Sequence, residues 1–538
     1  MVNYYSNAND FLCSNIERVV VFSESLTKKE TGLHLYGYCI DSTKIYKNQD
    51  ITKSEFDDLL EQNIEVCGIF SAVKFDNKVI ELVLDPLCQF NIFYYSNGQD
   101  FVLSSSLLAI REFLSIDSVC TSFLYDQIAY QSPMRGLTIL KDVYYIQFDD
   151  LENSSDSRSE FQVLDSCISV KINRPKYDFY SRLTYNDLLD LYVKRLNKKA
   201  QIVATHFDCV HIQLTGGADS RLAFSSFSQY DNVECYVYGG GDSQNRLIFE
   251  EITRAKNVRS ASSIRFVGQP LNNIARISKS LNDSNFFKFN NLNTCMNGVI
   301  DESKTYCKIT GYYGANISGG VVLPPHNTSL NQRLNKIPED LFTYHDYVSS
   351  FKFRHRNLRP ASFNDRFYIN NRGKSHYGAH SIADNKYVNA VDILYDYINI
   401  LLVERCPYSD SDIDRNAITI DLICLNDKQL ALFPYDNRRV PKYRYFDDIP
   451  LINCFDGYEF QTRDVNEFEV VRPVVDTEKF QFLDSGNSFM SNKQILNFCK
   501  VFDSAEKYGH LRYLCDEDGI QSNIFLYFLL SKIFLDLK

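Results

Sequence analysis

Tryptophan, long apolar runs and an excess of basic charge are all missing from this sequence. The absence of tryptophan says nothing about the function of the protein. The longest apolar run, residues 524–530, is far shorter than the roughly 20 residues that a membrane-spanning helix requires. A net charge of −11 gives no general attraction to nucleic acid or to anionic membranes. Because the amino terminus has neither a basic region nor an apolar run, we expect no secretory signal and a cytoplasmic protein.

Closely spaced cysteines are missing as well. The chain has 15 cysteines and no C-x-x-C pair, whereas disulfide frameworks and zinc sites normally show repeated short spacings. We therefore expect buried thiols that behave as small apolar side chains. His376 and His380 could face one side of a helix, but Gly378 lies between them and no H-E-x-x-H glutamate is present. A metal site at these histidines is not expected.

The composition that remains is that of an ordinary globular protein with more than one domain. Of 538 residues, 44% are hydrophobic and 23% are charged, and a single core rarely grows beyond about 250–300 residues. The first part of the chain has short β-rich runs, with Asp76-Asn77 as a hairpin turn between two of them. The serine-rich stretch 149–160 is interpreted as an exposed loop or an interdomain linker. The expected strands are 19–22, 33–38, 68–75, 79–84 and 92–95.

After residue 180 the pattern changes to alternating helices and strands. Apolar spacing predicts a helix over 187–204, a strand over 209–214, a helix from Arg221 and a strand over 234–238. This order predicts a parallel sheet with helices on its faces. Ligands bind such sheets at the carboxyl ends of the strands, and the stretch Thr215–Ser220 falls at one of them.

The stretch "LTGGADSR" has the chemistry of a phosphate cradle. Gly216 and Gly217 allow the backbone to turn its N–H groups toward one point, and the amino end of the following helix favours an anion. Thr215 and Ser220 offer hydroxyl groups, and Asp219 offers a carboxylate for a magnesium ion. A plain glycine turn is the alternative interpretation.

The loop is not a Walker-type phosphate loop, because no G-x-x-x-x-G-K-[ST] occurs. It resembles instead the S-G-G-x-D-S pyrophosphate loop of the adenine nucleotide α-hydrolases, with threonine for the first serine. Together with the following "YVYGGGDSQNRLIFEEITRAKNV", it is similar to the synthetase domain of asparagine synthetase-related proteins. The resemblance implies ATP and Mg²⁺ as cofactors, with Asp219 as the metal ligand. It places at the nucleotide Leu214, Thr215, Gly216, Gly217, Asp219, Ser220, Arg221, Tyr238, Gly239, Gly311 and Asn316.

The chain departs from this family at three segments. "ITGYYGANISGG" resembles the second glycine-rich segment, but Ala315 and Asn316 stand where an acidic pair is usual. "YGAHSIADNKYVNAV" keeps Asp384 of the E-x-R-x-P-F-L-D segment and has Tyr377 in place of the glutamate. A lysine normally assists near the end of the domain. Lys442 is the candidate catalytic residue and Lys428 the second choice, each with a solvated surface lysine as the alternative. Arg221 is expected either to touch phosphate or to be an exposed helix residue.

The amino-terminal half resembles the glutaminase domain that precedes these synthetases. "GIFSAVKFDNKVIELVLDPLCQFNIFYY" and "FVLSSSLLAI" carry the resemblance, including Asp85-Pro86 and Ser104-Ser105. A glutaminase of this type needs a free amino-terminal cysteine, whereas Met1 is followed by Val2 and the nearest cysteine is Cys13. We therefore expect a scaffold without glutaminase activity, as in β-lactam synthetases and lasso-peptide cyclases.

The resemblance implies an α/β fold in two parts and an extension. An α+β Ntn-hydrolase-like sandwich over 1–165 precedes a parallel-sheet adenine nucleotide α-hydrolase-like (PP-loop) domain over 180–450 with a helical C-terminal part, and 451–538 follow. The apolar run near the carboxyl terminus is interpreted as a helix docked on the domain, and the basic cluster 436–444 as a solvated loop, with contact to an anionic substrate as its alternative.

The implied function is that of an ATP-dependent, amide-forming ligase. It would adenylate a small-molecule, glycan or peptide carboxylate, release pyrophosphate and transfer the acyl group to an amine or to ammonia, the latter free or from a partner glutaminase. A pseudoenzyme with a binding or regulatory role is the alternative. A tRNA-modifying or sulfur-transferring relative is a third hypothesis, disfavoured by the acidic balance and the missing C-x-x-C, so no nucleic-acid partner is expected.

Overall fold

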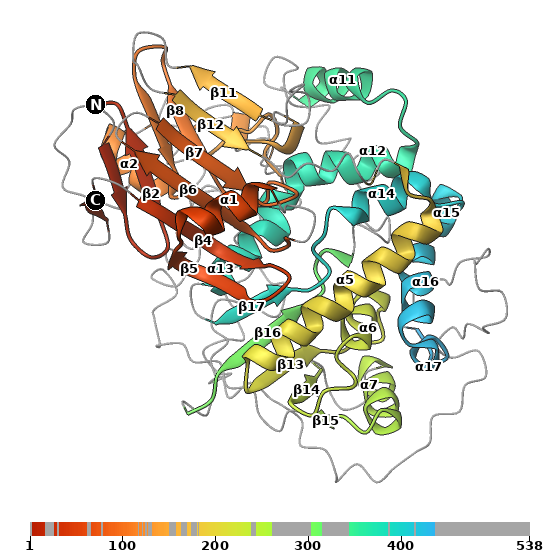
Figure 1. Ribbon diagram of the computed structural model, residues 1–538. Helices are drawn as coiled ribbons and strands as arrows, with labels where there is room; N and C mark the ends of the chain where they lie inside the picture. Colours follow the sequence, from red (N-terminus) through yellow and green to blue (C-terminus); the bar gives the residue numbers. More distant parts are fainter. Residues whose placement is uncertain are drawn as a thin grey trace, which may run out of the picture.

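The computed structural model has two β-rich sheets in its first part and a parallel sheet in its second part (Figure 1). Its described residues are 3–16, 26–29, 32–61, 66–76, 79–116, 118–120, 122–123, 126, 132–149, 158–162, 169–173, 180, 182–237, 244–260, 303–314, 344–385, 388–413 and 416–435.

The first sheet is antiparallel throughout, and the second contains one parallel pair. The first has the order β10 (Val143–Tyr145), β8 (Phe93–Ser96), β9 (Phe101–Ser104), β2 (Phe11–Ser14), β1 (Asn3–Ser6), β3 (Thr27–Lys29). The second has the order β11 (Arg158–Gln162), β12 (Ser169–Asn173), β7 (Val79–Leu84), β6 (Phe70–Asp76), β4 (Gly32–Ile40), β5 (Ile45–Asp50), with β12 parallel to β7.

These two sheets pack face to face. The ring of Tyr4 stacks on that of Phe75 at 4.8 Å, and the hydroxyl groups of Tyr4 and Tyr36 lie 2.7 Å apart in the buried interior. Helix α2 (Leu107–Leu114), capped by the Ser106 hydroxyl, covers the outer face of the first sheet. Helix α1 (Lys53–Glu61) covers the outer face of the second sheet through Phe56 and its neighbours. The result is a four-layer helix, sheet, sheet, helix arrangement.

The second part is built on a five-stranded parallel sheet. Its order is β15 (Arg259–Ser260), β14 (Val233–Tyr236), β13 (Cys209–Gln213), β16 (Tyr306–Thr310), β17 (Asn389–Asp392). Helix α5 (Tyr185–His206) begins in a capping box formed by Thr184 and Asp187. The remaining helices are α6 (Ala218–Ser225), α7 (Gln244–Ala255), α11 (Tyr344–Arg354), α12 (Pro360–Phe367), π-helix η5 (Tyr368–Gly378), α13 (Ala379–Asn385), α14 (Ile398–Arg405), α15 (Asp410–Ile413), α16 (Ala417–Asn426) and α17 (Lys428–Ala431).

The two parts share one continuous hydrophobic core. Residues 85–90 of the first part carry many of the polar contacts between them. The buried carboxyl group of Asp85 accepts hydrogen bonds from the Phe90 N–H, at 2.7 Å, and from the Tyr395 hydroxyl. The Gln89 side chain donates to the carbonyl of Ile369 and accepts from the Tyr313 hydroxyl, at 3.0 and 2.9 Å.

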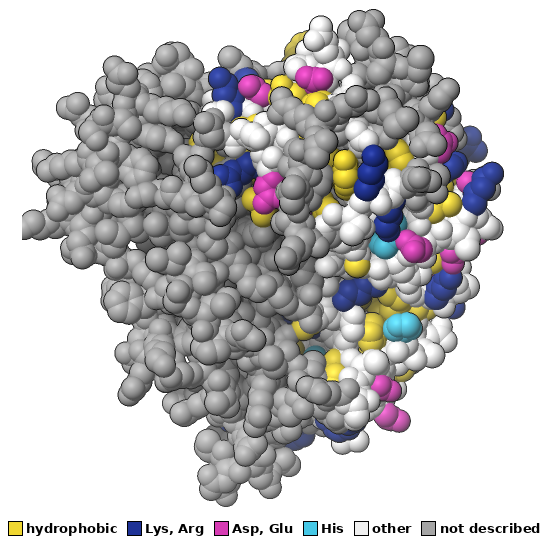
Figure 2. All heavy atoms as spheres, turned by 90° about the vertical axis from the view of Figure 1, so that its left-hand side faces the viewer, with side chains coloured by type: hydrophobic (Ala, Val, Ile, Leu, Met, Phe, Trp, Pro, Cys, Tyr) yellow, Lys and Arg dark blue, Asp and Glu magenta, His cyan; other side chains and the backbone are white. Residues whose placement is uncertain are grey.

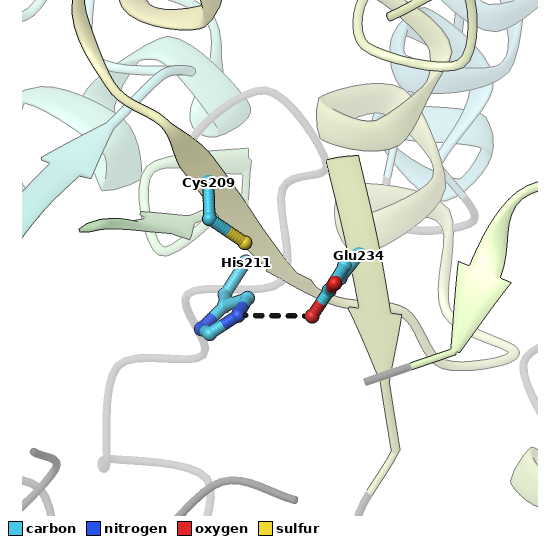
Figure 3. A group of neighbouring side chains, drawn as sticks. All are labelled: Cys209, His211 and Glu234. Atoms are coloured by element: carbon cyan, nitrogen blue, oxygen red, sulfur yellow. Dashed lines mark ion pairs between the residues drawn. The ribbon is translucent and has the colours of Figure 1, made fainter. Parts of the chain in front are cut away.

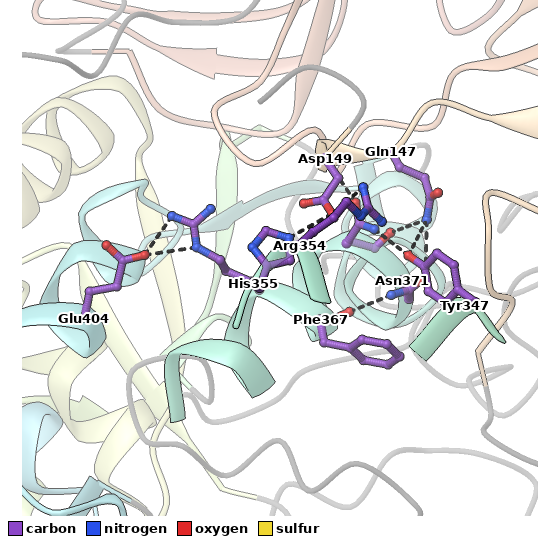
Figure 4. A network of polar contacts seen from close by, with 10 residues as sticks. Gln147, Asp149, Tyr347, Arg354, His355, Phe367, Asn371 and Glu404 are labelled. Carbon is purple, nitrogen blue, oxygen red and sulfur yellow. Dashed lines mark hydrogen bonds and ion pairs between the residues drawn. The ribbon is translucent and has the colours of Figure 1, made fainter. Parts of the chain in front are cut away.

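A second polar network joins the end of the first part to helices α11 and η5 (Figure 4). The Asp149 carboxylate lies 3.3 Å from Arg354 and 3.1 Å from His355. The Gln147 side chain donates to the Asn370 carbonyl and to the Asn371 side chain, both at 3.2 Å. Specific polar contacts, as well as the shared core, therefore hold the first part of the chain against the second part.

The structure confirms most of the expected elements and changes one interpretation. Strands β4, β6, β7, β8, β13 and β14 and helix α5 match expectations, whereas 19–22 lies outside the described residues. Helix α6 begins at Ala218, three residues before the expected Arg221, so Asp219 and Ser220 belong to the helix. The stretch 149–160 is not simply an exposed linker, because Asp149 is buried and Arg158–Glu160 belong to β11. Strand β12 extends the second sheet beyond residue 165. Within the described ranges, no helix combines the length and apolarity needed to cross a membrane.

Candidate functional site

The stretch Thr215–Ser220 lies at the carboxyl end of β13, in the middle of the parallel sheet. Strand β13 has β14 on one side and β16 on the other, so the chain crosses in opposite directions from this strand. The Leu214 N–H donates to the Tyr236 carbonyl at 2.9 Å and continues the strand pairing up to the loop. Helix α6 then begins at Ala218, with Gly217 as its N-cap. The loop thus occupies the switch point at which open α/β sheets bind ligands.

Side-chain oxygen atoms contact the N–H groups of this loop. The Thr215 N–H donates to the Ser220 hydroxyl at 3.0 Å, and the Gly217 N–H donates to the Thr215 hydroxyl at 3.1 Å. The Gly216 N–H donates to Oδ1 of Asn245, on α7, at 2.9 Å. These three N–H groups donate to side-chain oxygen atoms of the protein, so an anion must displace those oxygen atoms to bind here. The sequence did not single out Asn245, because its contact comes from the next crossover helix.

Asp219, in the first turn of α6, lies against a glycine turn that follows β16. A Cβ atom added to Gly314 would stand 2.7 Å from Cγ and 2.8 Å from Oδ1 of Asp219. At Gly311 an added Cβ would stand 3.3 Å from the Asp219 carbonyl oxygen. Gly311 therefore lies next to Asp219, as expected for two residues assigned to one site. Only glycine fits at Gly314 without moving the carboxyl group.

A further carboxyl group, which the sequence did not single out, contacts the same turn. Asp392 ends β17, and its carboxyl group accepts hydrogen bonds from the N–H groups of Tyr313 and Leu394, both at 3.2 Å. Burial raises the pKa of Asp392 to about 8, although these N–H groups oppose the shift. An acidic residue at the end of a strand was the available signal. The preceding residues "YVNAV" gave no clue that this strand pairs with β16 and reaches the glycine turn.

Arg221 is fully buried, so the interpretation of this residue as an exposed helix residue was wrong. Its Nη1 donates to the carbonyls of Leu430 and Phe433 at 3.1 and 2.9 Å, and its Nη2 donates to that of Pro434 at 2.5 Å. The guanidinium also lies 3.9 Å from the centre of the Tyr435 ring. These contacts hold the segment after α17 against the base of the loop.

Tyr377 belongs to an aromatic cluster beside the glycine turn. Its ring is parallel to that of Tyr312 at 5.3 Å and stacks on His376 at 4.0 Å. Nδ1 of His376 lies 2.9 Å from the Tyr368 hydroxyl, and His380 packs on Tyr312. Apolar stacking thus replaces the carboxylate that the family resemblance expects at position 377.

Asp384 lies in a buried ion pair. Its Oδ2 is 2.9 Å from Nζ of Lys308, which comes from β16. Burial raises the pKa of Asp384, and Lys308 opposes that shift. Burial lowers the pKa of Lys308, but the Asp384 carboxylate and the nearby tyrosines outweigh burial and hold that pKa well above its usual value. This retained residue joins α13 to the sheet.

The other expected site residues divide into two groups. Lys428 is exposed at the start of α17, as a solvated surface lysine would be. Cys13 is fully buried in β2, and burial raises the pKa of its thiol, which disfavours the nucleophilic thiolate. The residues that lie outside the described ranges are Val2, Tyr238, Gly239, Ala315, Asn316, Lys442 and the segments 436–444 and 451–538.

A small pocket, partly open to solvent, lies between β4 and α13. Its lining includes Asn9, Asn48 and Ser381, and no residue of the Thr215–Ser220 loop. The Asn48 side chain donates to Asn9 at 3.0 Å and accepts from the Gly37 N–H at 2.6 Å. These polar groups of the pocket lining thus bind one another. The pocket is therefore separate from the candidate phosphate site.

Among the residues that the structure describes, one cluster has the composition of a metal site. Cys209, His211 and Glu234 place their donor atoms within 4.8 Å of one another. His376 and His380, weighed from the sequence, belong to no such group of three in the described part. No model of a known protein family matches the chain, and no curated protein matches it.

Proposed function

We propose that the chain is an ATP-dependent, amide-forming ligase of the asparagine synthetase-related type. The observation that carries this proposal is the stretch Thr215–Ser220 at the switch point of a parallel sheet. It forms the turn after the central strand β13 and the beginning of helix α6. Its N–H groups bind oxygen atoms there, and Asp219 adjoins them. Such a loop suits the pyrophosphate part of a nucleotide.

The proposed reaction uses these residues to bind charge. A substrate carboxylate attacks the α-phosphate of ATP, pyrophosphate leaves, and an amine or ammonia then displaces AMP to form the amide. The N–H groups of Gly216 and Gly217 stabilise the negative charge on the leaving pyrophosphate once its oxygen atoms replace Asn245 and Thr215 as their acceptors. The amino end of α6 favours the same negative charge. Asp219 is the residue suited to hold Mg²⁺, which neutralises phosphate charge when it is bound.

The first part of the chain acts as a scaffold in this proposal. Its four-layer arrangement supports an Ntn-hydrolase-like assignment, and the parallel sheet supports a PP-loop assignment for the second part. Cys13, buried between the sheets, is unsuited to attack glutamine. Nitrogen then comes from an amine, free ammonia or a partner glutaminase.

A pseudoenzyme with a nucleotide-binding or regulatory role is the second candidate. The stacked Tyr377 favours it, because an aromatic cluster occupies a place at which the family resemblance expects a glutamate. Ala315 and Asn316 in place of an acidic pair favour it too. Under this alternative, nucleotide binds but no AMP forms with any carboxylate and amine.

Calorimetric titration tests the nucleotide site. The full chain is titrated with a non-hydrolysable ATP analogue in the presence of Mg²⁺, in parallel with Asp219→Ala and with Asp231→Ala, an exposed aspartate of the same βαβ unit. We expect binding by the wild type and by Asp231→Ala, and its loss in Asp219→Ala. Equal affinity in all three proteins, or none in the wild type, contradicts the proposal. AMP release in a screen of carboxylates and amines then separates ligase from pseudoenzyme.

A further inference from the structure

Cys209, His211 and Glu234 lie together at the amino end of the parallel sheet. Cys209 is the first residue of β13, and His211 follows two positions later, so their side chains share one face of the strand. The neighbouring strand β14 pairs His211 with Glu234 directly. The cluster therefore lies at the opposite end of β13 from the Thr215–Ser220 loop.

The three side chains point toward one another, as Figure 3 shows. Nε2 of His211 is 3.3 Å from Oε2 of Glu234, and the Cys209 sulfur completes a triangle with no donor pair beyond 4.8 Å. Tetrahedral zinc has ligand distances of about 2.0–2.3 Å, which places neighbouring ligand atoms roughly 3.3–3.8 Å apart. Side-chain shifts of about 1 Å close the triangle around such an ion.

The surroundings support both ligand orientation and access. Oε1 of Glu234 lies 3.8 Å from Arg259, while Oε2 faces the histidine, so the arginine orients the carboxylate from behind. The His211 ring lies 5.3 Å from that of Tyr306 on β16. Side-chain exposure of 13% for His211 and 27% for Glu234 leaves the cluster reachable from solvent.

We propose that Cys209, His211 and Glu234 bind one Zn²⁺-class divalent cation, with the fourth position taken by water. A thiolate, an imidazole and a carboxylate form a donor set that suits zinc better than magnesium or calcium. The bound ion crosslinks β13 to β14 and stabilises the sheet that carries the candidate nucleotide loop. The site is independent of the proposed ligase activity, since none of its residues belongs to the loop.

Protons compete with the metal at this site. Burial, followed by the nearby Glu234 carboxylate, raises the pKa of the Cys209 thiol to about 12. The ion must displace that proton to bind the thiolate. Affinity therefore increases as the pH rises.

Cobalt and zinc titrations of the chelator-treated full chain test the site. We expect one Co²⁺ per chain, with thiolate-to-metal charge-transfer absorption, displaced by Zn²⁺. Cys209→Ser should remove this absorption. Glu234→Gln, a nearly isosteric change at a partly exposed position, should weaken Co²⁺ binding at least about tenfold. Cys120→Ser, which removes a thiol of intermediate exposure in the first part, is the matched control and should bind as the wild type does.

Circular dichroism confirms that each variant is folded before titration. No binding by the wild type, or an unchanged spectrum in Cys209→Ser, overturns the proposal. Asp219→Ala should retain Co²⁺ binding, so the metal site and the nucleotide site stand or fall separately.

Discussion

At the scale of single residues, the position of Asp219 depends on Gly314. The two residues lie far apart in sequence, and the close approach of the glycine turn to helix α6 leaves no space for a Cβ atom. Arg221, two residues after Asp219, holds the segment behind the loop through backbone carbonyls. The candidate site is thus positioned by contacts that a short motif does not contain.

Gly314→Ala should damage the site and the fold together. The new methyl group would approach the Asp219 carboxyl group to 2.7 Å, so the side chain or the turn must move, at a cost of about 1–3 kcal/mol of unfolding free energy. We also expect weaker binding of the Mg²⁺–ATP analogue. Urea unfolding and calorimetric titration measure the two effects.

Gly98→Ala is the control for this change. Gly98 has a φ of +91° and no heavy atom within 4 Å of an added Cβ, so the substitution costs only the backbone strain of roughly 1–2 kcal/mol. It should leave nucleotide affinity unchanged. Gly314→Ala with wild-type affinity would show that Asp219 does not need its observed position.

At the scale of elements, the Lys308–Asp384 pair joins strand β16 to helix α13. Asp384 is fully buried and Lys308 nearly so. A buried pair contributes little net stability compared with apolar residues, but removal of one partner leaves an uncompensated charge. The pair therefore specifies how α13 packs beside the sheet.

A double-mutant cycle measures this role. Lys308→Met should lower the unfolding free energy by about 3–5 kcal/mol, because the Asp384 charge then lacks its partner. Adding Asp384→Leu should restore most of that loss, since no buried charge remains. Additive losses in urea unfolding would contradict a direct interaction between the two charges.

At the scale of the whole molecule, the β sandwich and the parallel sheet behave as one packed body. Their hydrophobic core is continuous, and Asp85 and Gln89 bind partners more than 200 residues away. The face seen in Figure 2 carries acidic and basic side chains interspersed over its described part. No cluster of charges of one sign is visible on the described part of that face.

Thermal unfolding should therefore show one cooperative transition for the two parts. Separate domains with small interfaces unfold independently, whereas a shared core couples them. Differential scanning calorimetry of the full chain measures this. Tyr395→Phe, which removes the hydroxyl that binds Asp85, should lower the midpoint without splitting the transition. Two well-separated transitions in the wild type would show that the shared core does not couple the parts.

Local chemistry in the sequence was enough to predict strands β4, β6, β7, β8, β13 and β14, helix α5 and a glycine turn after β13. Alternating and helical apolar spacing depends on neighbouring residues, and Gly216-Gly217 followed by a helix start is a signal contained within a few positions. These features were therefore predicted correctly before any long-range contact was known. The expected parallel sheet followed from the order of strand and helix.

Only the folded chain revealed the partners from distant segments. Asn245 at the Gly216 N–H, Asp392 beyond the glycine turn, buried Arg221 and the Cys209–His211–Glu234 cluster all depend on which strands and crossovers become neighbours. Such contacts join residues whose separation in sequence gives no local signal. Strand order and side-chain packing decide them, because the free energy of burial depends on the whole set of surfaces brought together.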